Sequence, residues 1–95
     1  MNLCSYAEIA RLLNRHGFHF SKALGQNFII DERVCPEMVR CLHADRDTGV
    51  LEIGPGIGVL TKELCKSAGK VVSIEFDKRL LPILDETLAE FSNFE

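Results

Sequence analysis

The chain contains 95 residues, of which 46% are hydrophobic and 26% charged, and its formal net charge is −3 at neutral pH. This length allows one domain with a modest core, and the composition is ordinary for a globular protein. The acidic balance argues against a protein that grips nucleic acid over its whole surface, and no apolar run approaches the roughly 18 residues needed to span a bilayer. Because no secretory signal pattern is present, we expect a cytoplasmic protein that has no membrane partner.

The four cysteines are scattered, with no C-x-x-C pair of the kind that binds zinc or forms a redox dithiol. We therefore expect reduced thiols, three of them buried as small hydrophobic side chains. The cysteines are Cys4, Cys35, Cys41 and Cys65.

The first predicted helix begins at a capping box. Ser5 can accept a hydrogen bond from the backbone N–H of Glu8, and the Glu8 side chain can reach back to Ser5. Gly17 suits the left-handed conformation that ends many helices. The apolar stripe at helical spacing consists of Ile9, Leu12 and Leu13.

Residues 19–30 (HFSKALGQNFII) show no clean period and predict a loop that is ordered by itself or by a ligand. A second helix is predicted from Asp31 to about Leu42, with Pro36 in its first turn or delaying its start. Its inward side chains are expected to be Val34, Met38, Val39 and Leu42.

Strands and helices alternate in the second half of the chain. Residues 50–53 (VLEI) predict a short strand buried on both faces, and residues 57–67 predict a helix stopped by Gly69. Residues 70–76 (KVVSIEF) predict a second buried strand, after which Asp77 can cap a third helix. The inner face of that helix is expected to contain Leu80, Leu81, Leu84, Leu88 and Phe91.

This order predicts a parallel β-α-β-α unit of the α/β class, the opening part of a Rossmann-like sheet that follows two N-terminal helices. We expect residues 1–47 to form a helical segment that covers a cofactor and residues 48–95 to form the first half of a cofactor-binding domain. Two parallel strands with unpaired edges make a poor stand-alone sheet, so marginal stability or self-association through the sheet edges is expected.

The segment LEIGPGIG turns from an apolar strand into a glycine loop. Gly54, Gly56 and Gly58 allow a tight turn and a close approach of the backbone to a ligand. Glu75 follows Gly54 by 21 positions, at the carboxyl end of the second predicted strand. A carboxylate there can accept hydrogen bonds from the hydroxyls of a ribose, so the pattern favours an adenosine-type ligand.

The details of the loop favour S-adenosylmethionine (SAM) over phosphorylated ligands. A dinucleotide loop would place its third glycine at position 59, which is Val59, and a Walker loop would need a lysine that GIGVLT lacks. Glu52, just before the loop, would repel a pyrophosphate. It suits a ligand that carries a sulfonium and an α-amino group.

The combination of SKALGQNFIID, VLEIGPGIGVLT and VVSIEFD closely resembles the small-subunit (16S) ribosomal RNA adenine dimethyltransferases, over about residues 17–91. The resemblance implies a SAM-dependent enzyme that methylates adenines of small-subunit ribosomal RNA, with the precursor of the small ribosomal subunit as its partner. It also implies that Gln26, Asn27 and the backbone around Ile29 close over the methionine end of SAM. Further implied contacts are Gly54 and Gly56 along the cofactor, Glu75 on the ribose and Phe76 against the adenine.

The family places an N-L-P-Y or N-I-P-Y segment after its fourth strand to position the target adenine. The prolines of this chain are Pro36, Pro55 and Pro82, and none has that context. We therefore expect the N-terminal part of a longer enzyme, with part of the cofactor site, no catalytic residues and no activity of its own.

Two other classes compete with this interpretation. A fragment of a nicotinamide-dependent oxidoreductase would share the Rossmann-like plan, but Val59 and Glu52 disfavour it. A helix-turn-helix DNA-binding module is suggested by YAEIARLLNRHGF, but the following segments are too acidic for a recognition helix in the DNA groove.

Overall fold

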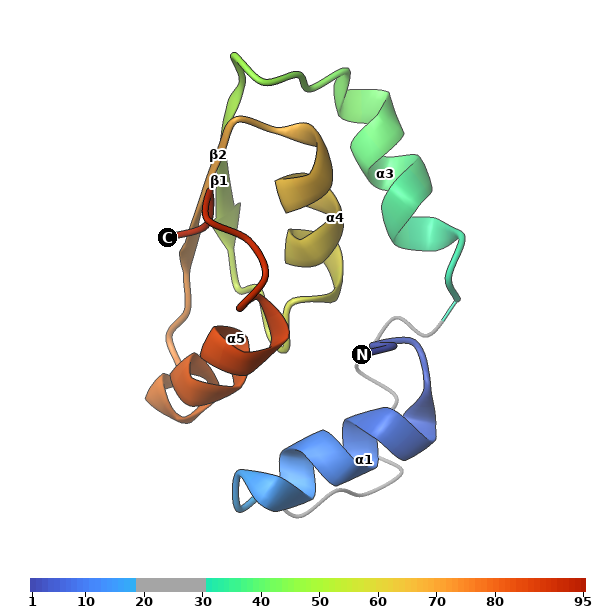
Figure 1. Cartoon of the computed structure of the whole chain (residues 1–95), viewed down its shortest axis with the longest axis vertical. Coiled ribbons are helices and arrows are strands. Elements are labelled where there is room, and N and C mark those ends of the chain that lie inside the picture. Colours follow the sequence, from blue (N-terminus) through green and yellow to red (C-terminus); the bar gives the residue numbers. More distant parts are fainter. Residues whose placement is uncertain (19–30) are drawn as a thin grey trace.

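A computed structural model describes residues 1–18 and 31–95 of the chain (Figure 1). The predicted loop at residues 19–30 lies outside the described residues. In chain order the elements are α1 (Tyr6–Arg15), α3 (Val34–Leu42), β1 (Gly49–Ile53), α4 (Val59–Ser67), β2 (Lys70–Ile74), the 3-10 turn η1 (Lys78–Leu80) and α5 (Leu81–Thr87).

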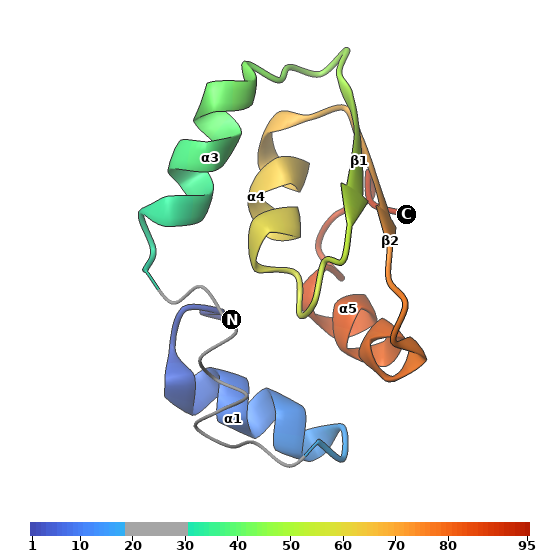
Figure 2. The ribbon, with the colours of Figure 1, turned by 180° about the vertical axis from the view of Figure 1, so that it is seen from behind.

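The two strands are parallel, with Gly49 opposite Lys70 and Ile53 opposite Ile74, and α4 connects them. The predicted β-α-β-α unit is therefore confirmed. Helix α4 lies against one face of the sheet, and α3 lies on the outer side of α4 (Figures 1 and 2). Helices α1 and α5 lie toward the carboxyl ends of the strands, where the glycine loop emerges.

The outer edge of β2 is occupied, contrary to the expectation of two unpaired edges. Val71 forms a parallel bridge with Phe94, and the backbone nitrogens of Val71 and Ser73 donate to the carbonyls of Asn93 and Glu95, each at 2.8 Å. Residues 93–95 thus lie along the edge of β2 that faces away from β1.

Two hydrophobic clusters form the core. The first joins α1 to the end of the glycine loop and to α5, through Leu3, Ile9, Leu12, Leu13, Ile57 and Ile83. The second lies between α3, α4 and the sheet, and contains Val39, Leu64, Cys65, Ala68 and Val71. Because the first cluster holds both Ile57 and Ile83, the packing of α1 also fixes the position of the glycine loop.

The opposite face of the sheet is exposed, so the prediction of strands buried on both faces was wrong. Leu51 and Ile53 are 65% and 71% exposed, because within the described residues no helix covers this face. Several helix side chains that were predicted to face the core are exposed instead, because only one side of each helix packs against the core. The exposed side chains among them are Val34, Met38, Leu42 and Leu81.

The four cysteines differ in burial. Cys35 and Cys65 are buried, whereas Cys4 is half-buried and Cys41 is exposed on α3. Two thiols are thus buried, rather than the predicted three.

Most predicted ends of helices and strands lie within a few residues of the observed ends. Ser5 accepts from the backbone N–H of Glu8 at 3.4 Å, but the Glu8 carboxylate accepts from the backbone N–H of Asn2 rather than from that of Ser5. Gly17 has a φ of +81°, as expected for the residue after a helix. Pro36 lies in the first turn of α3, which begins three residues later than predicted. Strand β2 ends at Ile74 rather than at residue 76, and α5 ends at Thr87.

Within residues 1–18 and 31–95, no helix is long and apolar enough to cross a membrane.

Candidate functional site

The loop between β1 and α4 depends on glycine at three positions. Gly54, Gly56 and Gly58 have φ values of +72°, +61° and +96°, a region that other residues adopt only with strain. Among the described residues, a Cβ added at Gly54 or Gly56 would meet no heavy atom within 4 Å, whereas one at Gly58 would lie 3.1 Å from Thr87 Oγ1. The first two glycines therefore expose their backbone to open space, and the third packs against α5.

Glu75 connects the loop to the end of the neighbouring strand. Its Oε1 accepts from the backbone nitrogen of Gly56 at 3.1 Å, and its Oε2 accepts from the backbone nitrogen of Asp77 at 2.9 Å. Each carboxylate oxygen can accept a second hydrogen bond. Glu75 is half-buried, so its carboxylate can bind a polar ligand while it holds the loop.

Glu52 lies near the end of β1 and is only 9% exposed. Its Oε1 accepts hydrogen bonds from the hydroxyls of Thr61 on α4, at 2.5 Å, and of Ser73 on β2, at 2.7 Å. The two donors offset part of the cost of burying this polar group. Neither was identified from the sequence, because the first requires the packing of α4 on β1 and the second requires the strand register.

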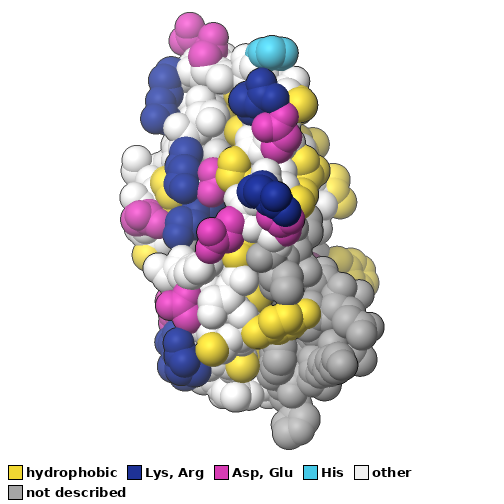
Figure 3. Space-filling view, turned by 90° about the vertical axis from the view of Figure 1, so that its right-hand side faces the viewer, with side chains coloured by type: hydrophobic (Ala, Val, Ile, Leu, Met, Phe, Trp, Pro, Cys, Tyr) yellow, Lys and Arg dark blue, Asp and Glu magenta, His cyan; other side chains and the backbone are white. Residues whose placement is uncertain are grey.

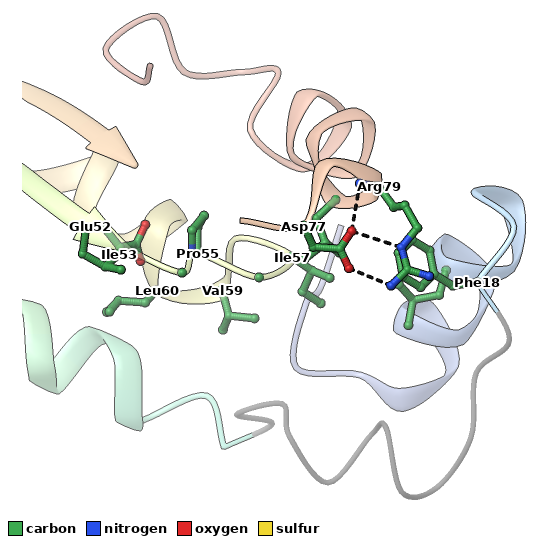
Figure 4. A pocket seen from close by; sticks show the side chains of 13 residues that line it. Phe18, Glu52, Ile53, Pro55, Ile57, Val59, Leu60, Asp77 and Arg79 are labelled. Carbon is green, nitrogen blue, oxygen red and sulfur yellow. Dashed lines mark hydrogen bonds and ion pairs between the residues drawn. The ribbon is translucent and has the colours of Figure 1, made fainter. Parts of the chain in front are cut away.

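A cavity of about 470 Å³ opens beside the glycine loop (Figure 4). Three of the residues that line it are Glu52, Gly54 and Gly56. Its volume falls within the range of pockets that hold small ligands, about 300–1,000 Å³. Most of the wall is apolar and is formed by Leu13, Phe18, Ile53, Pro55, Ile57, Val59, Leu60 and Leu80.

An ion pair at the other end of the cavity was not predicted from the sequence. Arg79 binds the Asp77 carboxylate, with Nη2 to Oδ2 at 2.7 Å, and its guanidinium lies 4.8 Å from the centroid of the Phe18 ring (Figure 4). Hydrogen bonds from the Arg79 side chain lower the pKa of Asp77 below its ordinary value. Asp77 caps the 3-10 turn η1 that precedes α5, rather than α5 itself as predicted, and it accepts from the backbone nitrogen of Arg79 at 3.0 Å.

The other predicted site residues are placed less directly. Gln26, Asn27 and Ile29 lie outside the described residues. Phe76 is 98% exposed just beyond β2, and neither it nor Glu75 belongs to the wall of the cavity. The structure therefore brings Glu52 and the two glycines together on the cavity and places Glu75 directly behind the loop.

The side of the molecule formed by α3 and α4 carries charges of both signs rather than a single basic patch (Figure 3). Lys66 pairs with Glu63 at 3.0 Å, and Arg40 pairs with Glu37 one turn away on α3.

Among the described residues, no group of three or more metal-ligating side chains could hold a metal ion. The site combines an open glycine loop, buried or half-buried carboxylates and an apolar wall, which are features of a site for an organic ligand.

A glycine loop after the first parallel strand, followed by an acid after the second, places the chain in the class of Rossmann-like α/β proteins. The sequence is matched over residues 17–95 by the family model of ribosomal RNA adenine dimethylase. The chain belongs to this family.

Relatives and solved structures agree with this assignment. The chain is 54% identical over 82 residues to ribosomal RNA small subunit methyltransferase A of Bacillus mycoides, covering 86% of this chain and 28% of that protein. The crystal structure of the 23S rRNA methyltransferase ErmE matches with a TM-score of 0.68 and 39% identity, over 73% of this chain and 28% of that one.

Phosphoethanolamine N-methyltransferase 1 from Haemonchus contortus was solved in complex with phosphoethanolamine and S-adenosylhomocysteine. It matches with a TM-score of 0.57 and 26% identity, over 67% of this chain and 14% of that one. The chain spans 28% of the length of the curated relative from Bacillus mycoides. These findings do not support the oxidoreductase or the helix-turn-helix alternative.

Proposed function

We propose that this chain provides part of the SAM site of an rRNA adenine N6,N6-dimethyltransferase that acts on small-subunit ribosomal RNA. The observation that carries the proposal is the arrangement of two acids, Glu52 and Glu75, at the ends of adjacent parallel strands. The open backbone of Gly54 and Gly56 lies between them, beside a cavity.

The residues present fit this cofactor. No atom of the described residues lies within 4 Å of an added Cβ at Gly54 or Gly56, which leaves room for a ligand against this part of the loop. Glu75 can accept from ribose hydroxyls with the lone pairs that Gly56 and Asp77 do not use. Glu52 supplies negative charge toward a cationic amino-acid moiety, and the apolar wall excludes water. SAM supplies the methyl group, carried on a sulfonium.

Other assignments in the proposal depend on the family. Gln26, Asn27 and Ile29 would cover the methionine end of the cofactor, and Phe76 would lie against its adenine. We propose residues 1–47 as the covering segment and residues 48–95 as the first half of the cofactor domain. The target is an adenine of the small-subunit precursor in the cytoplasm, and the 95 residues alone are expected to leave that RNA unmodified.

Calorimetric titration of the chain with S-adenosylhomocysteine, with NADH in a parallel experiment, tests the cofactor. Saturable binding of S-adenosylhomocysteine without binding of NADH is the expected result. Binding of NADH alone, or of neither compound, would contradict the proposal.

A second experiment tests the activity of the isolated chain. After incubation with SAM and small-subunit RNA, mass spectrometry of nucleosides should detect no dimethyladenosine. Detection of dimethyladenosine would contradict the expected inactivity of the isolated chain.

We also propose that the isolated chain self-associates through the edge of β1. Within the described residues β1 pairs with β2 alone, and an edge strand that bears exposed apolar side chains is prone to pair with another copy. Sedimentation velocity should therefore show a mass that increases with concentration. A monomer at all concentrations would contradict this expectation.

A further inference from the structure

Glu52 and Ser73 are directly opposite one another in the register of β1 and β2. Their side chains therefore lie on the same face of the sheet, the face against which α4 packs. Ser73 Oγ donates to Glu52 Oε1 at 2.7 Å, and Thr61 Oγ1 approaches the same oxygen from α4 at 2.5 Å. One carboxylate oxygen is thus fixed by donors from two different elements.

This arrangement restricts the orientation of the carboxylate. The two hydrogen bonds to Oε1 hold the Glu52 carboxylate in one orientation. Neither hydroxyl donates to the second oxygen, Oε2. Glu52 also lines the cavity beside the glycine loop, at the end away from Phe18 and Arg79 (Figure 4).

The charges around the cavity indicate the kind of group that Glu52 can bind. Among the described residues of the wall, the charged side chains are Glu52, Asp77 and Arg79, and the last two neutralise one another in an ion pair. No lysine or arginine in the described part of the chain pairs with Glu52. A carboxylate that has no counter-ion among the described residues, in a mostly apolar cavity, favours a ligand with positive charge.

We propose that Thr61 and Ser73 are positioning residues, which orient the Glu52 carboxylate so that its other oxygen accepts from the ammonium of a ligand's amino-acid moiety. This inference rests on the proposed SAM site and adds to it the two hydroxyls that set its selectivity for a cationic group. Charge-assisted hydrogen bonds are directional and strong, so a misoriented carboxylate would bind the ammonium less well.

Two ligands separate this role from a general structural one. S-adenosylhomocysteine carries the α-amino group, whereas 5′-methylthioadenosine has the same nucleoside without the amino acid. We expect Ser73→Ala and Thr61→Val each to weaken calorimetric binding of S-adenosylhomocysteine by about tenfold, the size expected when a hydrogen bond to a charged group is lost. Binding of 5′-methylthioadenosine should be unchanged. Thr61→Ser should restore binding, and Ser67→Ala, at the far end of α4, serves as the matched control.

A double-mutant cycle tests whether the hydroxyl acts through Glu52. In the Glu52→Gln background, Ser73→Ala should cause no further loss of S-adenosylhomocysteine binding. Equal losses for both ligands, or an undiminished effect of Ser73→Ala in that background, would overturn the positioning role.

The failure of this inference is distinguishable from the failure of the proposed function. If the unmodified chain binds neither ligand, the proposed cofactor site is overturned, and with it the ligand assigned to Glu52. If the unmodified chain binds S-adenosylhomocysteine but Ser73→Ala and Thr61→Val bind it equally well, the positioning role alone is overturned.

Discussion

Gly56 and Glu75 are 19 positions apart in sequence and are joined by a hydrogen bond of 3.1 Å from the backbone nitrogen of the glycine to Oε1 of the acid. This contact closes the glycine loop onto the carboxyl end of the next strand. The same carboxylate accepts from the backbone nitrogen of Asp77, so one side chain organises both turns that border the cavity. The acid is therefore part of the scaffold of the site as well as a candidate ligand contact.

Replacing Glu75 tests both of these roles. Glu75→Gln keeps the shape but loses the charge and one acceptor oxygen, so one of the two backbone N–H groups loses its partner. We expect S-adenosylhomocysteine to bind about tenfold more weakly, as for the loss of one hydrogen bond to a charged group. Titration calorimetry measures the change, with the exposed Asp85→Asn as a control of equal charge change. Equal affinities of Glu75→Gln and Asp85→Asn would contradict the assignment.

The loop glycines should differ in their sensitivity to substitution. Gly56→Ala introduces only backbone strain, on the order of 1 kcal/mol, because its Cβ would meet open space. Gly58→Ala adds contacts of 3.1 Å with Thr87 and 3.3 Å with Leu84, so it should destabilise the fold by a further kcal/mol or so, about the lower cost of overpacking. Thermal unfolding followed by circular dichroism gives the order of stability. A Gly58→Ala chain as stable as Gly56→Ala would contradict the packing described for α5.

The cysteines should differ in reactivity. Burial raises the pKa of Cys65 to about 11, so at pH 8 very little of this thiol is in the reactive thiolate form. Burial also raises the pKa of Cys35, whereas Cys41 is exposed on α3. Mass spectrometry after brief treatment with iodoacetamide should therefore show modification at Cys41 before Cys65. Labelling in denaturant, where every thiol is accessible, is the control, and early labelling of Cys65 in the folded chain would contradict its burial.

The ion pair between Arg15 and Glu86 should make the stability of the fold depend on pH. Nη1 and Nη2 of Arg15 each lie 2.7 Å from a carboxylate oxygen of Glu86, and these hydrogen bonds lower the pKa of Glu86 below its ordinary value of 4.5. Because the folded value is the lower one, the contribution of Glu86 to stability is present above pH 4.5 and is lost as the pH falls through the folded value.

Glu86→Gln tests this pH dependence. The unmodified chain should melt at a higher temperature than Glu86→Gln at pH 7, and the difference should vanish in acid. Salt should reduce the difference at pH 7, because both side chains are partly exposed. Glu90→Gln, whose ion pair with Lys62 is longer at 3.7 Å, is the control. A difference between Glu86→Gln and the unmodified chain that persists unchanged in acid would contradict this prediction.

Features with a local cause were predictable from the sequence. Ser5 starts α1, Gly17 follows its end, and the glycines of the loop adopt positive φ, because capping and backbone sterics depend on a few neighbouring residues. The order of strands and helices was predictable for a similar reason, since parallel strands require a crossover helix. Glu52, Gly54 and Gly56 line one cavity for a similar reason, because the carboxyl end of a parallel strand and the loop after it must be adjacent.

Features that depend on distant packing were not predictable in this way. The apolar sequence of β1 predicts burial on both faces, yet Leu51 is 65% exposed, because a strand cannot specify which faces of its sheet other elements cover.

The sequence by itself determined the α/β order, the glycine loop and the family. Only the tertiary structure decided that residues 93–95 pair with β2, that Arg79 and Phe18 border the cavity, and that Thr61 and Ser73 hold Glu52. These last contacts require the strand register and the packing of helices on the sheet, which arise only when the whole chain folds.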